Sequence, residues 1–375
     1  MSKPRIIALY LPQFHPFPEN DEWWGKGFTE WTNVARARPL FKGHYQPRIP
    51  ADLGFYDLRL PIVREQQAEL AREAGIEAFC YWHYWFGNGK QLMADIIDEV
   101  IATGKPDFPF CLGWANHSWY AKNWNVKDAN RKDKLLIEQI FPGDDDIRMH
   151  YEYALKAFKD PRYVKVGNKP FFMIFEADNI PANFISLWNT WAQEDGFDGI
   201  YFVGNVKVGD GAKEYIRKGF CAVIKDRIHE QRRLVSIRIN KSFLASIKSL
   251  LTRCVHIITN SPNHVFMYDK SIEVYIDAID DAREEVIPSL IPGFDHSPRS
   301  GKNGYIVHGS TPALFQKHVK EVLNIIKKKE NKIVMLRSWN EWGEGNYMEP
   351  DLKYGKAYIQ ALRKEIDKFE VSLES

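Results

Sequence analysis

Cysteine is scarce in this sequence, which has four among 375 residues: Cys80, Cys111, Cys221 and Cys254. They are scattered, no two form a C-x-x-C pair, and three lie inside apolar runs typical of buried strands. Free buried thiols suit a reducing compartment.

Long apolar runs and an excess of one charge are also lacking. No run is long enough to span a membrane, and the first residues, MSKPRIIALYLPQF, lead straight into a strand pattern without a cleavable signal. Lys and Arg total 51 against 49 Asp and Glu, so neither nucleic acid nor an anionic membrane is an expected partner. The expected location is the cytoplasm, with a peripheral position at the inner membrane as an alternative.

Several chemical signatures are missing as well. His and Cys do not cluster at metal-ligand spacing, and no dinucleotide fingerprint or G-x-S-x-G elbow occurs. The stretch GNGK at Gly87–Lys90 is too short for a phosphate loop and lacks the Ser or Thr that would follow. We therefore expect no metal and no cofactor.

Aromatic residues, in contrast, are abundant, with 12 Trp, 17 Tyr and 23 Phe. Many stand beside His, Asn, Gln and Glu instead of inside apolar runs. Such mixtures suit sugars, because the C–H face of a sugar stacks on an indole while its hydroxyls take directed hydrogen bonds. A large aromatic core is the structural alternative for about half of them.

Short apolar runs that predict strands alternate about eight times with amphipathic segments that predict helices. Strands are expected at Ile6–Leu11, Ala78–Trp82, Phe108–Gly113, Phe171–Phe175, Ile200–Gly204, Phe220–Ile224, Val286–Gly293 and Ile333–Leu336. Helices are expected at Pro61–Ala74, Leu92–Thr103, Asp144–Lys159, Ile185–Glu194, Pro312–Lys328 and Gly355–Phe369. This order predicts an α/β protein, a single (β/α)8 TIM barrel domain over residues 1–375.

One region, 225–285, breaks the alternation. It holds a basic helical stretch and then HVFMYDKSIEVYI, whose alternation predicts an antiparallel hairpin. We expect it to be an insertion carried on the barrel.

Polar and aromatic clusters follow the predicted strands, where barrel enzymes place their sites. The candidate substrate-binding residues are Tyr10, Gln13, His15, Glu30, Trp31 and Asn33 after strand one; Tyr81, His83 and Trp85 after strand two; Trp114, Asn116 and His117 after strand three; Asp295 and Arg299 after strand seven; and Asn340, Trp342 and Tyr347 after strand eight. Each cluster also has a structural alternative. His83 could be a buried histidine with a backbone partner, Glu30 could cap a helix, and Asp295 could be a turn residue. The tryptophans of the last cluster could serve packing alone. Their shared position in one set of loops favours a site.

The last cluster, SWNEWGEG, sets Glu341 and Glu344 three residues apart between indoles and glycines. Glycoside cleavage needs a proton donor and a second carboxylate. Neighbouring acids shift each other's pKa, and an apolar wall can keep one protonated near neutral pH. Both are the candidate catalytic residues.

The stretches Ile7–Arg59, Phe79–Met93 and Ser338–Gly355 closely resemble the WbsX-like family, described as glycosyltransferases of surface-polysaccharide gene clusters. That family is similar to glycoside hydrolase family 99, the endo-acting α-mannosidases. The resemblance implies a (β/α)8 barrel without metal that retains anomeric configuration. It implies that Glu341 helps the sugar 2-hydroxyl attack the anomeric carbon, giving a 1,2-anhydro intermediate, and that Glu344 acts as acid and then base.

The middle of the chain departs from the family pattern. His117 stands where Glu is usual, Glu176-Ala177-Asp178 replaces a Tyr-Arg-Pro, and His296 replaces Asn. These loops would line sugar subsites, so the departures bear on which sugar is bound.

The leading hypothesis is a carbohydrate-active enzyme that cleaves or transfers α-linked mannose- or rhamnose-type glycans of a bacterial surface polysaccharide, with an oligosaccharide or lipid-linked glycan as partner. A nucleotide-sugar-dependent transferase of lipopolysaccharide or O-antigen synthesis is the alternative, although Asp144–Asp146, the only acidic run, reads as a helix start. A non-catalytic glycan-binding barrel is another. A metal-dependent hydrolase using His15, His83 and His117 is a further one. The oligomeric state is not predicted.

Overall fold

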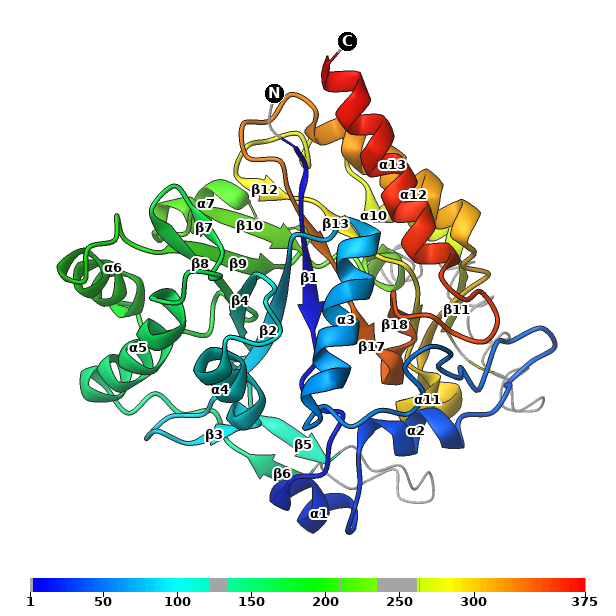
Figure 1. The fold of residues 1–375 in the computed structure, drawn as a ribbon, viewed down its shortest axis with the longest axis horizontal. Coiled ribbons are helices and arrows are strands. Elements are labelled where there is room, and N and C mark those ends of the chain that lie inside the picture. Colours follow the sequence, from blue (N-terminus) through cyan, green and yellow to red (C-terminus); the bar gives the residue numbers. More distant parts are fainter. Residues whose placement is uncertain (1–2, 122–133, 210, 235–261, 263, 375) are drawn as a thin grey trace, which may run out of the picture.

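The computed structural model describes residues 3–121, 134–209, 211–234, 262 and 264–374. Parallel strands at its centre form a nearly closed barrel, as the sequence predicted, with helices around it (Figure 1). Around the barrel follow β1 (Arg5–Tyr10), β2 (Ala78–Trp85), β4 (Phe110–Trp114), β8 (Lys169–Ile174), β9 (Tyr201–Val206), β10 (Ala222–Lys225), β12 (Val286–Ile287) with β13 (Ser289–Leu290), and β16 (Ile333–Leu336).

The predicted seventh strand is divided in two by Pro288. Because proline has no N–H to donate, it interrupts a ladder. β12 pairs with β10 on one side, and β13 pairs with β16 on the other. The Pro288 carbonyl still accepts a hydrogen bond from Met335 N at 3.0 Å. The two short strands therefore fill one barrel position.

Most helices of the described residues lie around the barrel: α3 (Pro61–Ala74), α4 (Ala94–Thr103), α5 (Asp144–Phe158), α6 (Phe184–Glu194), α7 (Ala212–Arg217), α10 (Tyr268–Tyr275), α12 (Pro312–Ile326) and α13 (Ala357–Glu374). Three short ones lie at the carboxyl ends of the strands: α1 (Pro18–Trp24), α2 (Glu30–Arg36) and α11 (Ser297–Ser300). Figure 1 shows α13 lying along α12 and beside α3. No helix within the described ranges combines the length and apolar character needed to cross a membrane.

Local signals explain where these helices start and stop. Proline occupies the first turn of α3, and Gly75 ends it in the left-handed region with φ 81°. Asp144, Asp145 and Asp146 lie in the first turn of α5, where carboxylates favour the positive helix end. All eight residues of β2 are buried, as expected for a strand covered on both faces.

Small sheets complete the fold. β3 (Gln91–Leu92) and β7 (Lys165–Val166) pair with barrel strands. Separate pairs are β5 (Trp119–Ala121) with β6 (Lys134–Ile137), and β17 (Asn340–Glu341) with β18 (Asn346–Tyr347).

The expected hairpin in the insertion is wrong. His264–Met267 forms β11, which pairs in parallel with β15 (Tyr305–His308), and β15 pairs antiparallel with β14 (Phe294–Asp295). The segment Tyr268–Tyr275 is helix α10, because Tyr268, Ser271, Ile272 and Tyr275 bury one helical face. Most of the basic stretch before it lies outside the described residues.

Candidate active site

A cavity of about 1050 Å³ opens at the carboxyl ends of the barrel strands. This is the end at which barrel enzymes carry their catalytic groups. Residues that line it from strand ends and the segments after them are Leu9, Leu11, Gln13, Trp82, Tyr84, Ala115, His117, Phe175, Asp226, Arg337 and Ser338. Helices α1 and α2 and the segment around α11 form further walls.

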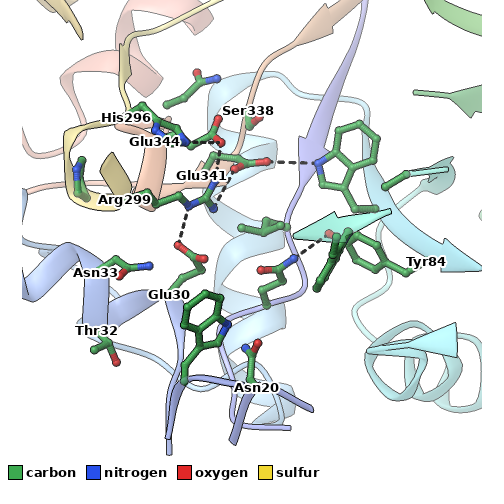
Figure 2. A pocket seen from close by; sticks show the side chains of 18 of the residues that line it. Asn20, Glu30, Thr32, Asn33, Tyr84, His296, Arg299, Ser338, Glu341 and Glu344 are labelled. Atoms are coloured by element: carbon green, nitrogen blue, oxygen red, sulfur yellow. Dashed lines mark hydrogen bonds and ion pairs between the residues drawn. The ribbon is translucent and has the colours of Figure 1, made fainter. Parts of the chain in front are cut away.

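A single guanidinium joins three carboxylates in this cavity (Figure 2). Arg299 of α11 donates from Nε to Glu30 Oε2 at 3.1 Å, and its Nη1 forms an ion pair with Glu344. Its Nη2 lies 3.7 Å from Glu341 Oε2. The planar fork of arginine can serve several carboxylates in fixed geometry. Arg299 therefore holds acids from α2 and from the turn of residues 340–347 at one point. We call this turn the catalytic turn, after the two catalytic candidates that it carries.

The two catalytic candidates have opposite pKa shifts. Burial, then the charge of Glu344, raises the pKa of Glu341 to about 8, although Arg299 opposes this. Burial also acts to raise the pKa of Glu344, but Arg299 first, and then the neighbouring His296, His229 and Arg337, outweigh it and lower that pKa. Near neutral pH the pair therefore holds one proton, and in the free pocket Glu341 carries it.

Other contacts orient the two acids. Trp82 Nε1 donates to Glu341 Oε1 at 3.3 Å, and His296 Nε2 lies 3.8 Å from Glu344 Oε1. In Figure 2 Glu341 reaches toward the indole on the β2 side, whereas Glu344 lies beside His296. The acids thus face different walls of the cavity.

Two positions of the turn require glycine: Gly343, between the two glutamates, and Gly345, directly after them. A Cβ on Gly343 would overlap Glu30 Oε2 and lie 3.0 Å from Arg299 Nε. Gly345 has φ 56°, which favours glycine, and a Cβ there would lie 2.9 Å from Asp295 Cβ. The turn can therefore pack against Arg299 at Gly343 and against Asp295 at Gly345 only without side chains at these positions.

We expect Gly343→Ala to lower kcat/KM at least about 10-fold, because the added methyl separates Glu30 from Arg299 and small displacements of catalytic groups are costly. Steady-state kinetics on folded protein would measure it. Gly211→Ala is the matched control, since nothing lies within 4 Å of a Cβ there. Unchanged kcat/KM in Gly343→Ala would contradict the packing argument.

Part of the predicted site does come together. The cavity is lined by the predicted residues Gln13, Glu30, Asn33, His117, Arg299, Glu341 and Glu344. Burial lowers the pKa of His117, which keeps its imidazole neutral and able both to donate and to accept. Substrate contact by these residues remains a proposal.

Strand alternation removes several other candidates from the cavity. Successive side chains of a strand point to opposite faces. Trp82 and Tyr84 of β2 line the cavity, whereas Tyr81, His83 and Trp85 do not. Tyr10, Trp114 and Asn116 are likewise absent from its walls, although their neighbours Leu9, Leu11, Ala115 and His117 are present. We therefore do not expect direct substrate contact from these six predicted residues.

The His83 imidazole belongs to a buried cluster outside the barrel mouth. His83 Nε2 lies 2.9 Å from His150 Nε2, and the Trp85 ring stacks on His150 at 4.8 Å. Burial lowers the pKa of His83 to about 3, so it is neutral. The structural alternative thus describes His83 better, with a second histidine in place of a backbone partner. Trp114 Nε1 donates to the Trp85 carbonyl at 2.9 Å.

Hydrogen bonds hold several of the predicted residues that do not line the cavity. Tyr10 OH donates to Gln67, and Trp31 Nε1 donates to the Tyr56 carbonyl. Asn116 bonds to the backbone of Glu176, as Asn340 does to that of Leu11. The following predicted residues are also absent from the cavity walls: Trp31, Asn340, Trp342 and His15, which lies 3.6 Å from Asp95.

Asp295 and Tyr347 line a second cavity of about 250 Å³ behind the catalytic turn. Asp295 Oδ2 accepts from His44 Nε2 and Gln46 Nε2, both at 2.8 Å. Hydrogen bonding to His44 and the nearby Arg48 offset burial and lower the Asp295 pKa to about 2. Asp295 is therefore held ionised, and its Oδ1 accepts from Ser297 N at 3.0 Å, as the turn-residue alternative would have it. Because Asp295 does not line the first cavity, we do not expect it to contact substrate there.

Sequence reasoning missed Trp82, Asp226, His229 and Arg337, which all line the cavity. Trp82 carried no signal in the sequence, because every residue of β2 is buried. Arg337 directly follows β16, where a charged residue after the apolar run IVML was a usable signal. Within the described ranges no three His, Cys, Asp or Glu side chains gather closely enough to hold a metal ion.

The chain is similar to proteins of known families. The family described as "Glycosyltransferase WbsX" matches residues 6–362. Two proteins named "Uncharacterized protein WxcX", from two strains of Xanthomonas campestris pv. campestris, are 33% identical over 372 residues, covering 96% of this chain and 49% of theirs. The chain thus spans about half the length of these curated relatives.

Solved structures share the fold at low sequence identity. A "Glycoside hydrolase-like protein" superposes with a TM-score of 0.59 at 16% identity, covering 98% of this chain and 94% of its own. The GH99 endo-alpha-mannosidase from Bacteroides thetaiotaomicron, in complex with bis-tris-propane, gives 0.58 at 13% identity, covering 99% and 98%.

Proposed function

Since this chain belongs to the WbsX glycosyltransferase family, we propose that it is a carbohydrate-active enzyme whose catalytic groups are Glu341 and Glu344. The observation that carries the proposal is the pair itself: two half-buried acids in one cavity, held by Arg299, with opposite pKa shifts. Pairs of acids whose environments push their pKa values apart are typical of acid–base sites.

The cavity suits an oligosaccharide. A volume of about 1050 Å³ exceeds the needs of one sugar ring. Its walls include Trp23, Trp24, Phe28, Tyr84 and Trp119, whose faces can stack on sugar rings. We propose α-linked mannose- or rhamnose-type glycans of a bacterial surface polysaccharide as substrates.

The proposed reaction breaks the glycosidic bond in one step and opens a 1,2-anhydro sugar in the next. Glu341 takes the proton of the 2-hydroxyl as O2 bonds to C1, and Glu344 gives a proton to the leaving oxygen. Water or a sugar hydroxyl then attacks C1, passing its proton to Glu344, while Glu341 returns a proton to O2. Two inversions retain configuration, and hydrolysis and transfer share the intermediate.

This assignment requires the proton to change places when substrate binds. In the free pocket Glu341 carries it. A 2-hydroxyl that donates to Glu341 favours its carboxylate form, and a glycosidic oxygen that accepts from Glu344 favours its acid form. Substrate hydrogen bonds thus supply the exchange.

We propose a lipid-linked glycan as the finer choice of substrate, with its diphosphate against the wall beside Glu344. Arg337, His229 and His296 line this side of the cavity. Arginine and histidine can bind phosphate oxygens, as a diphosphate-linked leaving group would need. The Arg337 guanidinium is nevertheless partly balanced by Asp226, 3.6 Å away.

The test is a substrate panel. We expect the wild-type protein to cleave or transfer an α-mannosyl or α-rhamnosyl oligosaccharide, free or lipid-linked, with retention of configuration seen by anomeric NMR. Mass spectrometry would identify the product. Parallel assays with nucleotide-sugar donors are the control, and turnover that appears only with those donors would contradict the proposal.

A further inference from the structure

Glu349 is a buried acid, which lies behind the catalytic turn and does not line the cavity. Its side chain accepts hydrogen bonds from Trp342 Nε1 at 2.6 Å, Gln67 Nε2 at 2.6 Å and Tyr56 OH at 2.9 Å. The residue is only 3% exposed. Such a carboxylate is stable in the interior only while donors surround it.

Hydrogen bonds fix both chain neighbours of Glu341, which are Asn340 and Trp342. Trp342 is held by Glu349, whereas Asn340 exchanges two hydrogen bonds with the backbone of Leu11, at 2.7 and 3.0 Å. The Trp342 ring also stacks on Tyr347 at 3.8 Å. The backbone on both sides of Glu341 is therefore tied to the barrel through buried side chains.

We propose that Glu349 is a positioning residue for the glycan reaction: its carboxylate holds Trp342, and through Trp342 the turn that carries Glu341 and Glu344. This inference rests on the proposed function. Gln67 links Glu349 further to β1, because Tyr10 OH donates to Gln67 Oε1 at 2.6 Å. The turn is thus connected with the barrel wall by a continuous chain of hydrogen bonds.

The charge of Glu349 matters because its three partners are all donors. An ionised carboxylate only accepts, whereas a protonated one presents an O–H that would face these donors. Burial raises the pKa of Glu349 to about 7, although the bonds from Trp342, Gln67 and Tyr56 oppose the rise. Protonation as the pH falls through about 7 therefore weakens the hold on Trp342.

Few ionisable groups surround this carboxylate. Tyr10 of β1 and Tyr56 face it, and burial keeps both phenols protonated by raising their pKa values. Arg64 of α3 also acts on Tyr10 and ion-pairs with Glu99 at 2.9 Å. No cation among the described residues forms an ion pair with Glu349 that would hold it ionised in acid.

Glu349→Gln tests the inference, because an amide would turn N–H donors toward donors. We expect kcat to fall about 100-fold with KM within about twofold, as for a displaced catalytic group. The acid limb of the kcat profile near pH 7 should disappear. Glu365→Gln is the matched control, since Glu365 is a 4% exposed carboxylate that also accepts from a glutamine, Gln316, at 2.6 Å. Glu365→Gln should keep the wild-type kcat and the acid limb of the kcat profile near pH 7.

A second measurement needs no substrate. The Trp342 indole N–H, assigned by its loss in Trp342→Phe, should give a downfield NMR signal that titrates near pH 7 and moves upfield in Glu349→Gln. An unmoved signal, or kcat and acid limb unchanged in Glu349→Gln, would overturn the inference. If the signal responds but the wild type turns over no glycan, the proposed function fails while the link between Glu349 and the turn stands.

Discussion

Glutamine in place of Glu341 or Glu344 is expected to lower kcat at least about 1000-fold on natural glycans, since each positioned acid or base contributes roughly 10²–10⁴-fold. Glutamine keeps the shape and removes the proton transfer. Initial rates from product mass spectrometry would measure the loss. Exposed Glu138, outside the cavity, offers the control Glu138→Gln, which should leave kcat unchanged.

Leaving groups distinguish the two roles. A glycosyl substrate with a good leaving group, such as a fluoride, needs no proton from an acid. Glu344→Gln should therefore recover most of its activity on such a substrate in the first step, whereas Glu341→Gln should not. The reverse pattern would show that the proton on Glu341 in the free pocket is the one delivered to the leaving oxygen, and would exchange the roles.

Replacement of Arg299 by methionine is expected to be equally severe. Glu344 would lose its ion pair, and Glu30 and Glu341 would lose a cation that lies 3.1 and 3.7 Å from them. The pKa values of Glu341 and Glu344 should both rise, so the pair holds two protons near neutral pH and lacks a base. We expect kcat/KM to fall at least about 100-fold and the bell-shaped profile to move to higher pH.

Arg299→Met should also be less stable than the wild type, by an amount that depends on pH. Breaking a buried charge pair typically costs about 3–5 kcal/mol, and the partial exposure of Arg299 places the expected loss at the lower end. Carboxylates with raised folded-state pKa values stabilise below their unfolded pKa and lose this stability as pH rises through the folded one. The Tm deficit of Arg299→Met should therefore be largest near pH 8 and shrink toward pH 5.

Arg299→Lys is the control, because it keeps the charge without the fork. It should retain the wild-type pH profile better than the methionine variant does, at reduced kcat/KM. Equal profiles for lysine and methionine variants would show that geometry alone, without the charge, sets the protonation of the pair.

Which parts of the site the sequence predicted depends on the strength of local signals. Glu341 and Glu344 stood out because acids between indoles and glycines conflict with both a core and a surface. His83 was predicted for the site and Trp82 was missed, because β2 is buried on both faces. Its sequence therefore carries no alternation of polarity to show which side chains face the cavity.

The same limit applies to the insertion and to Glu349. The stretch 264–276 alternates in hydrophobicity over a few residues, and so short a pattern fits a strand as well as helix α10. Glu349 gives no local signal at all. Its partners Tyr56 and Gln67 lie more than 280 residues away along the chain, and only the closed barrel brings them together.

The pairing of β1 with β16 has a consequence for synthesis on the ribosome. Arg5 lies opposite Ile333 and Ala8 opposite Leu336. One edge of β1 therefore stays uncovered until β16 has been synthesised. Glu30 and Arg299 likewise meet Glu341 only after nearly the whole chain has been translated. A nascent chain cannot be active early, and its open edge is the part that a chaperone would need to shield.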